Sequence, residues 1–324
     1  MRAVLVDPEA KRLVVDDVPD PEPGPGQLLV RVAAAGVNRA DLAVTAGTYH
    51  GRAARERFVA GGELAGEVIA LGPDVDGFAL GDRIMSMGPG FAELAAVPTA
   101  LAMPVPAGMD DATAGALPVA LATMHNALVT HGRLAGGQHV VVNAASSGVG
   151  VVGVRIALHL GAATVVGTSR SADKRACLEE LVGDDRFRAV APEDLVATVQ
   201  ELTGGRGVDV VVDNVGAAAL TENIAAAAVL GRIVQVGRLG GRSATIDLDE
   251  LARKRISLIG VTFRTRSASE RTAVVQAAWR ELAEAIASGT VAPIVHAQYA
   301  LDEVPAAHRA LARDEHVGKL VVRP

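Results

Sequence analysis

The sequence predicts an α/β protein with two domains, of which one is a doubly wound parallel sheet and the other is β-rich and barrel-like. Short β-rich runs between glycines and prolines fill the first third of the chain. From about residue 140, apolar runs alternate with helical periods, which is typical of a parallel sheet covered by helices on both faces. The length of 324 residues favours two domains. We expect the sheet domain at residues 120–263 and the barrel-like domain at residues 1–119 and 264–324.

The first third is predicted to consist of short strands joined by turns. A segment rich in proline and glycine at residues 19–26 separates the earliest strands from the later ones. The β-rich runs lie at residues 3–6, 12–15, 28–33, 64–70, 83–87 and 92–97. Many short strands with turns between them favour a compact, partly open barrel.

The period changes near residue 110, where helical patterns begin at 110–117 and 120–131. The expected strands of the sheet domain are residues 140–142, 164–167, 208–212, 233–236 and 256–261, and its expected helices are 149–160, 172–181 and 220–230. Ser267 and Glu270 have capping-box spacing before a long helix at 271–288. A strand near Val295, a helix at 304–311 and a strand at 319–322 follow, and we expect this last segment to return to the first domain.

Composition and charge exclude several function classes. The net charge of -6 and the eight aromatic residues (five Phe, two Tyr, one Trp) argue against nucleic-acid binding, which needs cations and stacking platforms. The single cysteine, Cys177, can form neither an internal disulfide nor a multi-thiolate zinc site, which favours a reducing, cytoplasmic location. The N-terminal apolar run is too short for a signal peptide, and Pro118, His125 and Asn126 interrupt the Ala-rich stretch 112–128. We therefore expect no membrane span.

Residues 140–150 have the pattern of a dinucleotide site: a strand, a turn of small residues and the start of a helix. Small residues let the backbone approach a pyrophosphate, and the unpaired N–H groups of the helix meet its charge. Two registers are available, with small residues either at Gly148, Gly150 and Gly153 or at Ala145, Ser147 and Gly150. We prefer the second because the turn should follow the strand closely. The predicted contacts are Ser146, Ser147, Gly148 and Val149.

The end of the second strand decides between NADH and NADPH. An acidic residue there would bind the ribose 2′-hydroxyl of NADH, whereas cations suit the 2′-phosphate of NADPH. The residues after this strand include Ser169, Arg170, Ser171 and Lys174, which can surround a phosphate. Asp173 competes with this interpretation, but an acid in the first turn of a helix has a sufficient structural reason. We predict NADPH as the cofactor.

Several motifs together resemble a known family, the zinc-independent quinone oxidoreductases of the medium-chain dehydrogenase/reductase superfamily. The matching motifs lie at residues 35–42, 46–49, 63–68, 81–83, 145–150 and 318–321. Residues 260–267 look like the p53-inducible quinone reductase subgroup in particular. The resemblance covers nearly the whole chain. It implies a Rossmann domain between the two parts of a discontinuous GroES-like catalytic domain.

The resemblance also implies which residues lie near the reacting groups. Zinc-dependent relatives have a cysteine where this chain has Asn38 and a histidine where it has Gly62, so no metal site is expected. Without zinc, hydrogen-bond donors must polarise the acceptor, and Asn38 and Tyr49 are the candidates for this catalytic role. A turn cap and a pocket wall are the alternative roles for these two side chains. Thr123 matches a family position beside the nicotinamide, although a buried helix threonine is nearly as good an account.

Further cofactor contacts are expected where strands end, because a doubly wound sheet opens its ligand crevice there. Asn214 follows one strand, and Val236, Gly237 and Arg238 follow the next. Past the last strand of the sheet and on the returning segment, the predicted contacts are Phe263, Arg264 and Lys319.

These features predict an NADPH-dependent reductase of quinones or activated α,β-unsaturated carbonyl compounds. A reductase of 2-enoyl thioesters is the nearest alternative, and a non-catalytic NADPH-binding structural protein is an alternative of another class. Three arginines at positions 52, 55 and 57 either grip an acyl-CoA phosphate or are simply solvated. An apolar strand at 256–261 would form the edge of the sheet, and in the family two such edges join, which predicts a homodimer.

Overall fold

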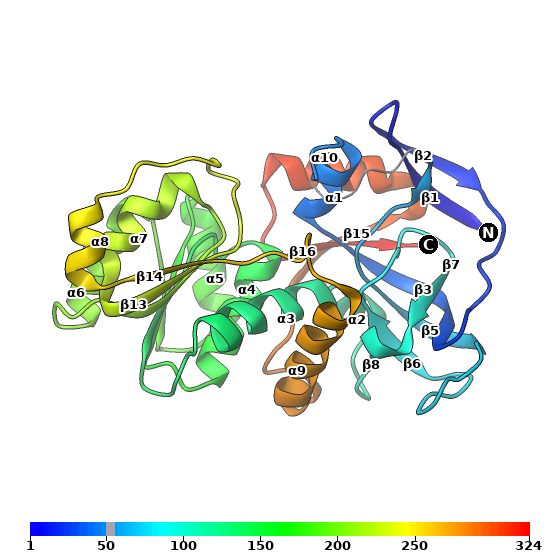
Figure 1. The fold of residues 1–324 in the computed structure, drawn as a ribbon, viewed down its shortest axis with the longest axis horizontal. Coiled ribbons are helices and arrows are strands. Elements are labelled where there is room, and N and C mark those ends of the chain that lie inside the picture. Colours follow the sequence, from blue (N-terminus) through cyan, green and yellow to red (C-terminus); the bar gives the residue numbers. More distant parts are fainter. Residues whose placement is uncertain (50–55) are drawn as a thin grey trace. The chain divides into compact units, whose positions relative to one another are not determined.

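The computed structural model describes residues 1–49 and 56–324 (Figure 1). The chain divides into two compact units. Unit 1 contains Met1–Val119 and Phe263–Pro324, and unit 2 contains Ala120–Thr262. Both ends of the chain therefore belong to unit 1.

Unit 2 alternates strands with helices, as its sequence pattern predicts. Its elements are α3 (Pro118–His125, which begins in unit 1), η2 (Asn126–His131), β9 (His139–Val142), α4 (Gly148–His159), β10 (Thr164–Thr168), α5 (Ala172–Val182), β11 (Phe187–Val190), η3 (Pro192–Asp194), α6 (Leu195–Leu202), β12 (Val208–Asp213), η4 (Ala217–Ala219), α7 (Leu220–Ala226), β13 (Ala227–Gln235), α8 (Leu248–Lys254) and β14 (Ser257–Gly260).

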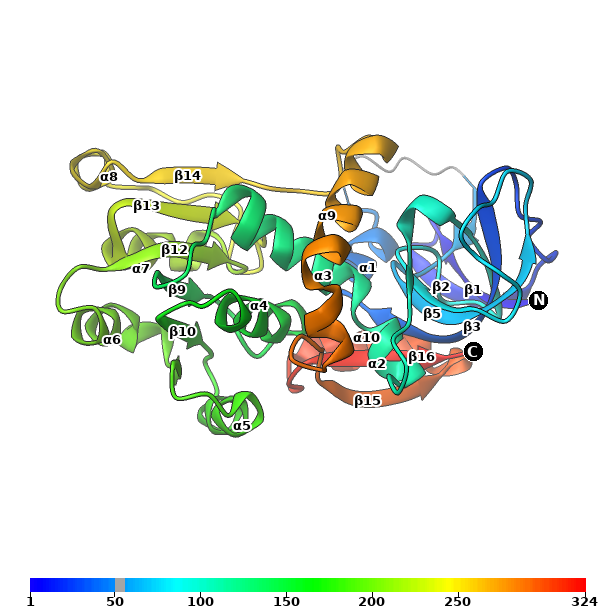
Figure 2. The same cartoon turned by 90° about the horizontal axis from the view of Figure 1, so that it is seen from below.

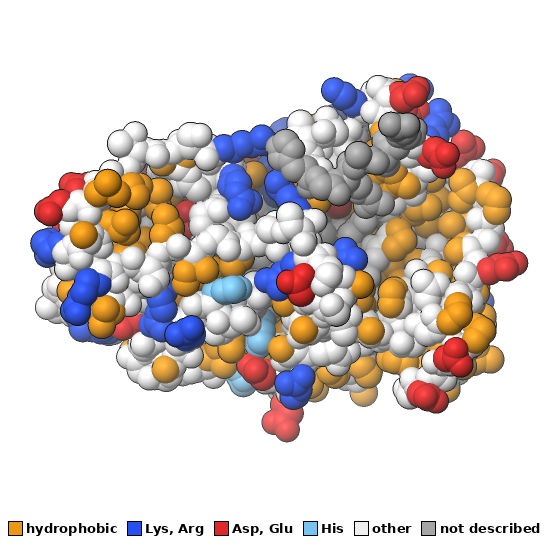
Figure 3. All heavy atoms as spheres, in the orientation of Figure 1, with side chains coloured by type: hydrophobic (Ala, Val, Ile, Leu, Met, Phe, Trp, Pro, Cys, Tyr) orange, Lys and Arg blue, Asp and Glu red, His pale blue; other side chains and the backbone are white. Residues whose placement is uncertain are grey.

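The six strands of unit 2 form one parallel sheet in the order β11-β10-β9-β12-β13-β14. Helix α4 packs on β9 and β10, whereas α6 and α7 pack against each other, with α6 on β10 and α7 on β12 and β13 (Figures 1 and 2). The order runs outward in both directions from β9, which confirms the predicted doubly wound sheet. Strand β14 stands at one end of it. Figure 3 shows hydrophobic side chains gathered on the surface over α7, α8 and β14.

Unit 1 is rich in short strands. Its elements are β1 (Arg2–Asp7), β2 (Arg12–Asp17), β3 (Gln27–Val37), α1 (Arg39–Thr45), β4 (Phe58–Val59), β5 (Leu64–Leu71), β6 (Arg83–Ser86), β7 (Leu94–Pro98), η1 (Thr99–Leu101), β8 (Ala102–Pro104), α2 (Asp111–Gly115), α9 (Ala268–Ala287), β15 (Val295–Ala300), η5 (Leu301–Glu303), α10 (Val304–Arg313) and β16 (Lys319–Arg323).

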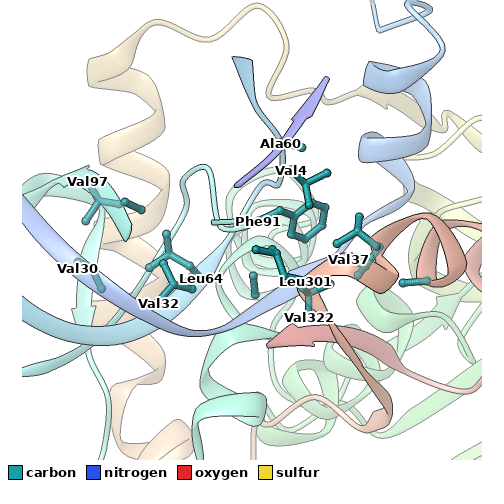
Figure 4. Close-up of a cluster of buried hydrophobic side chains, with 14 of the residues drawn as sticks. Val4, Val30, Val32, Val37, Ala60, Leu64, Phe91, Val97, Leu301 and Val322 are labelled. Carbon is teal, nitrogen blue, oxygen red and sulfur yellow. The ribbon is translucent and has the colours of Figure 1, made fainter. Parts of the chain in front are cut away.

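The core of unit 1 joins the two ends of the chain. Strand β16 pairs with β3 in a sheet ordered β15-β16-β3-β5-β6-β8, with β7 also on β3, and a second sheet has the order β2-β1-β4. Figure 4 shows Val4 and Phe91 beside Leu301 and Val322, and all four side chains are almost completely buried. Apolar burial between segments about 300 residues apart is what returns the C-terminal segment to this unit.

The structure corrects one predicted helix. The sequence pattern predicts a helix at residues 220–230, but α7 ends at Ala226 and β13 begins at Ala227. Residues 224–230 are apolar throughout, so their pattern cannot separate a buried helix from a strand. The chain becomes extended at Ala227, the C-cap residue of α7, whose φ and ψ are -68° and 142°.

Short elements escape the sequence patterns, which predict neither α1 nor α8, nor the pair β11 and α6. Helices α1 and α8 have seven residues each, about two turns, and are too short for a periodic pattern. The predicted capping box is confirmed, since Ser267 and Glu270 exchange side-chain-to-backbone hydrogen bonds at the start of α9. Within the described parts of the chain, no helix has the length and apolar character that crossing a membrane requires.

Candidate active site

The turn between β9 and α4 brings backbone very close to backbone. Ala144 has a φ of 50°, and a Cβ added to Gly150 would collide with the carbonyl oxygen of Ala144 and with Ala145. Ser147 precedes α4, and its Oγ accepts a hydrogen bond of 3.1 Å from Gly150 N. This arrangement follows the register with small residues at 145, 147 and 150. Only a glycine at position 150 allows the turn to pack this tightly.

The first turn of α4 can receive an anion. The N–H groups of Gly148 and Val149 precede the first intrahelical hydrogen bond, which Val151 N donates to Ser147 O. Ser146 lies beside this turn, buried, with its Oγ 3.1 Å from that of Ser169 at the end of β10. Backbone N–H groups at a helix start, next to two hydroxyl groups, have the chemistry of a phosphate site.

The loop after β10 carries the cations that the sequence predicts. Ser171 is the N-cap of α5, and its Oγ accepts from Lys174 N at 3.3 Å. A residue that the sequence reasoning missed, Arg175, reaches back from α5 and donates to the carbonyl oxygens of Ser169 and Arg170 at 2.8 and 3.0 Å. The sequence position of Arg175, one turn into the helix, could have indicated that its side chain reaches back to the loop. Arg175 holds the loop and adds a positive charge beside it.

The ends of β12 and β13 are tied to each other. The N–H groups of Val236 and Gly237 both donate to Asp213 O, at 2.8 and 3.0 Å. Asn214 is buried and donates from Nδ2 to Asn143 O at 2.9 Å. Arg238 is half-buried and lines a cavity of about 300 Å³ with Asp213, whose pKa burial raises above its usual range. Thr123, the remaining predicted contact of unit 2, is half-buried on α3.

A nicotinamide dinucleotide fits the donor set of unit 2. The glycine turn admits the backbone of a close-packed ligand, the helix start offers N–H groups, and the loop after β10 offers hydroxyl groups and cations. Each of these groups comes from the end of a parallel strand, where such sheets bind ligands.

Unit 1 holds a buried polar cluster around Asn38, which precedes α1. The Asn38 Oδ1 accepts from Lys319 Nζ at 2.7 Å, and its Nδ2 donates to Glu63 Oε1 at 2.9 Å and to Gly36 O at 3.3 Å. The backbone N of Asn38 donates to Asp41 Oδ2 at 2.8 Å. The amide group of Asn38 is therefore fully engaged inside unit 1, and polarising a substrate would require breaking one of these bonds.

Lys319 and Glu63 form an ion pair of 2.5 Å, with side chains 3% and 0% exposed. The sequence reasoning expected Lys319 near the cofactor, and within unit 1 its ammonium group contacts Glu63 and Asn38. Burial raises the pKa of nearby Asp41 to about 7, against the opposing effects of the Asn38 N–H and the Lys319 charge. Glu63 and Asp41 were missed as site residues, although Glu63 opens the quoted motif at 63–68.

The cluster does not fit a zinc ion. The two positions where the zinc-dependent relatives have ligands carry an amide, Asn38, and no side chain, Gly62. The ammonium group of Lys319 already lies between Asn38 and Glu63, and its positive charge would repel a metal cation.

Tyr49 and Arg264 lie together in unit 1. The guanidinium carbon of Arg264 is 4.5 Å from the centroid of the Tyr49 ring, which is a cation–π contact. Phe263 has a similar contact with Arg266, at 5.3 Å. The Thr48 and Tyr49 N–H groups both donate to Ala43 O, so the chain folds back after α1 and fixes the backbone of Tyr49.

The three arginines of the sequence hypothesis divide into two groups. Arg52 and Arg55 lie outside the described residues. Arg57 forms ion pairs with Asp7 at 2.9 Å and with Asp16 at 3.9 Å. Whether this loop binds a substrate stays a prediction.

Two protein-family models match the chain. The model described as alcohol dehydrogenase GroES-like domain matches residues 24–107, in unit 1. The model described as zinc-binding dehydrogenase matches residues 148–286, most of which lie in unit 2.

Individual proteins match over nearly the whole chain. Erythronolide synthase EryA2 of Saccharopolyspora erythraea is 35% identical over 92% of this chain, which spans only 8% of that synthase. A quinone oxidoreductase-like protein 2 homolog of Nematostella vectensis is 29% identical, with 99% of this chain and 88% of that protein covered. The solved structure of mycobacterial Rv1454c in complex with NADPH has 30% sequence identity and a TM-score of 0.86, with both chains fully covered.

Proposed function

This chain belongs to the medium-chain dehydrogenase/reductase superfamily, with quinone oxidoreductase-like proteins among its relatives, and we propose that it reduces quinones or activated α,β-unsaturated carbonyl compounds with NADPH. The observation that carries the proposal is the loop after β10. Its serine hydroxyl groups stand beside Arg170, Lys174 and Arg175, and no carboxylate occupies the first positions after the strand. Such a set suits a 2′-phosphate.

Unit 2 supplies the groups that would hold the coenzyme. The N–H groups of Gly148 and Val149 would bind the pyrophosphate, and the hydroxyl groups of Ser146 and Ser169 would add hydrogen bonds beside them. When bound, NADPH supplies the hydride. The remaining work of the protein is to orient the coenzyme and to stabilise charge on the acceptor.

Unit 1 supplies the hydrogen bond to the acceptor. We assign this role to the Tyr49 hydroxyl group, because the Asn38 amide is fully engaged with Lys319, Glu63 and Gly36. The guanidinium group of Arg264 lies over the Tyr49 ring, where it would orient the phenol and favour negative charge on an acceptor oxygen bound to the Tyr49 hydroxyl group. Asn38 then serves to hold the start of α1.

Steady-state oxidation of NADPH with 1,2-naphthoquinone tests the proposal. We expect turnover by the purified protein, with Tyr49→Phe lowering kcat by about tenfold to a hundredfold. Tyr299→Phe is the matched control because Tyr299, the other tyrosine of the chain, lies on β15 and packs against the core. NADPH binding without turnover of any quinone, enone or enoyl thioester would instead favour a non-catalytic, nucleotide-binding role.

A second candidate is the reduction of 2-enoyl thioesters. The 35% identity to a stretch of erythronolide synthase EryA2 is the observation that favours it. This reaction needs the same hydride delivered to an electron-poor alkene. Comparing kcat/KM for crotonyl-CoA and for 1,2-naphthoquinone separates the two, and a far higher value with the thioester would replace the quinone assignment.

We also propose that the protein is a cytoplasmic homodimer. Strand β14 is at the end of its sheet and exposes Leu258, and the same part of unit 2 exposes Val229, Leu230 and Leu248. An apolar sheet edge is a ready surface for pairing with a second copy. Light scattering at micromolar concentration is expected to give the mass of a dimer, and Leu258→Asp is expected to give a monomer.

A further inference from the structure

Glu63 is a buried carboxylate whose two oxygens bind different parts of unit 1. Its Oε1 accepts from Asn38 Nδ2 at 2.9 Å and from Lys319 Nζ at 2.5 Å. Its Oε2 accepts from the backbone N–H of Val119 at 2.7 Å. The side chain is 0% exposed, so these partners replace water completely.

Two of the partners of Glu63, Asn38 and Val119, lie at the start of a helix. Asn38 is the residue before α1, and Val119 is the second residue of α3, where a backbone N–H has no partner within the helix. Helix α1 leads to Tyr49, whose backbone N–H is bound to Ala43 O. Helix α3 includes Thr123. One carboxylate thus ties down the beginnings of the two helices that lead to predicted reaction residues.

The surrounding backbone is shaped for this carboxylate. A Cβ on Gly36 of β3 would collide with Glu63 Oε1 and would lie 2.9 Å from Gly115 O. The buried ammonium group of Lys319 balances the negative charge of Glu63 and offsets the cost of burying that carboxylate. The Glu63 side chain therefore needs a glycine at position 36 and the Lys319 ammonium group as its counter-ion. It also needs two hydrogen-bond donors, Asn38 Nδ2 and the Val119 N–H group.

We propose that Glu63, with Lys319 as its counter-ion, is a positioning residue for the reduction, because it fixes the starts of α1 and α3. The inference rests on the proposed function for its kinetic readout. It extends that function by assigning a role to two buried charged residues that do not contact the acceptor.

The test compares Glu63→Gln, Lys319→Met and the double variant with the wild type. Each single variant leaves one buried charge without its partner and is expected to lower Tm. The double variant removes one negative and one positive buried charge, so no charge is left without its partner. Its Tm is therefore expected to return most of the way to that of the wild type. Its kcat with NADPH and 1,2-naphthoquinone is expected to stay about tenfold or more below the wild type, because the Asn38 and Val119 anchors are weakened. The exposed pair Arg83 and Asp111, neutralised by Arg83→Met with Asp111→Asn, is the control.

Hydrogen exchange supplies a readout that does not need turnover. In the double variant, exchange is expected to accelerate in the peptides covering residues 36–49 and 117–125 and to stay unchanged in α9. If the double variant regains both Tm and kcat, or shows no faster exchange at the two helix starts, the positioning role is wrong. If it does not fold, Glu63→Asp decides: it keeps the negative charge beside Lys319 but is one methylene shorter, so its carboxylate cannot keep the bonds to Asn38 Nδ2 and Val119 N together. Wild-type kcat in this variant would overturn the proposal, and a tenfold loss would support it.

A wild-type protein without reductase activity would contradict the proposed function and leave the hydrogen-exchange prediction standing. An active wild type whose double variant behaves identically would contradict the positioning role alone.

Discussion

The turn between β9 and α4 in unit 2 and the cluster around Glu63 in unit 1 are built from different materials. The turn uses backbone N–H groups, small residues and a close-packed glycine, Gly150, within a stretch of seven residues. The cluster uses the charged or amide side chains of Asn38, Asp41, Glu63 and Lys319, and the partners Asn38 and Lys319 are 281 residues apart. The turn is therefore sensitive to substitutions that add volume, and the cluster is sensitive to substitutions that change charge.

This difference determines how each region should fail. In the turn, an added methyl group has nowhere to go, because backbone atoms surround Gly150. In the cluster, removing one charge leaves the opposite charge buried without a counter-ion, because Lys319 is 3% and Glu63 0% exposed. Variants that add volume and variants that remove charge therefore separate the two regions.

The largest expected effect is the loss of the counter-ion in unit 1. Lys319→Met is predicted to reduce the free energy of unfolding by about 3–5 kcal/mol, because the Glu63 carboxylate stays buried without its partner. Chemical denaturation measures this value. Lys254→Met is the control in unit 2, since Lys254 also pairs with a glutamate, Glu250, but at a more exposed site. Equal losses of unfolding free energy in Lys319→Met and Lys254→Met would contradict the claim that the buried pair in unit 1 is the more sensitive to loss of charge.

The next effect concerns pH. Burial lowers the pKa of His308, on α10 in the core of unit 1, from 6.5 to about 4. The unfolded chain therefore binds a proton that the folded chain does not, so this contribution to stability is complete above pH 6.5 and is lost as the pH falls towards 4. The loss amounts to roughly 3 kcal/mol. His308→Leu should remove it, so that the difference between wild type and variant changes by this amount between pH 7 and pH 4.

Asp41 has the opposite sign. Its folded pKa of about 7 exceeds the usual 3.8, so its contribution favours the folded state below pH 3.8 and is lost as the pH rises towards 7. Asp41→Asn should therefore gain stability relative to the wild type as the pH rises. Denaturation curves of both variants across this range check the signs, and two slopes of the same sign would refute the assignment of these groups.

A smaller effect is expected from the turn of unit 2. Gly150→Ala is predicted to cost about 1–3 kcal/mol of stability, because the new methyl group overlaps Ala144 and Ala145. It should also weaken NADPH binding by about tenfold, since the helix start moves. Gly136→Ala in the same unit is the matched control, because a Cβ there meets nothing closer than 3.9 Å. Thermal melts and coenzyme titration of both variants measure the outcome, and identical behaviour would remove the packing argument.

The same contrast explains what the sequence could predict. The turn was predictable because strand, small residues and helix start follow one another within residues 140–150. The doubly wound sheet was predictable because five of its six strands carry their own apolar patterns, and only β11 was missed. The Glu63 cluster was not, because no local pattern tells that Lys319 lies against Asn38, or that both side chains are buried. Arg175 was missed for a similar reason, since its role depends on how α5 leaves its loop.

The smallest effect concerns coenzyme choice in unit 2. Arg175→Ala is predicted to raise KM for NADPH by about tenfold, near 1.4 kcal/mol, and to change KM for NADH much less, because the loop that would face the 2′-phosphate loses its brace and a charge. Arg155→Ala is the control, as Arg155 also bonds a carbonyl group, Leu181 O, in the same unit. Equal changes with both coenzymes would show that Arg175 has no part in selectivity.

Oxidation of NADPH by 1,2-naphthoquinone, measured with protein dialysed against a strong zinc chelator, tests a metal-free, NADPH-dependent reduction most directly. We expect turnover at the same rate before and after dialysis, and a kcat/KM for NADPH at least about tenfold above that for NADH. Loss of activity on chelation with recovery on adding zinc, or equal use of the two coenzymes, would contradict it.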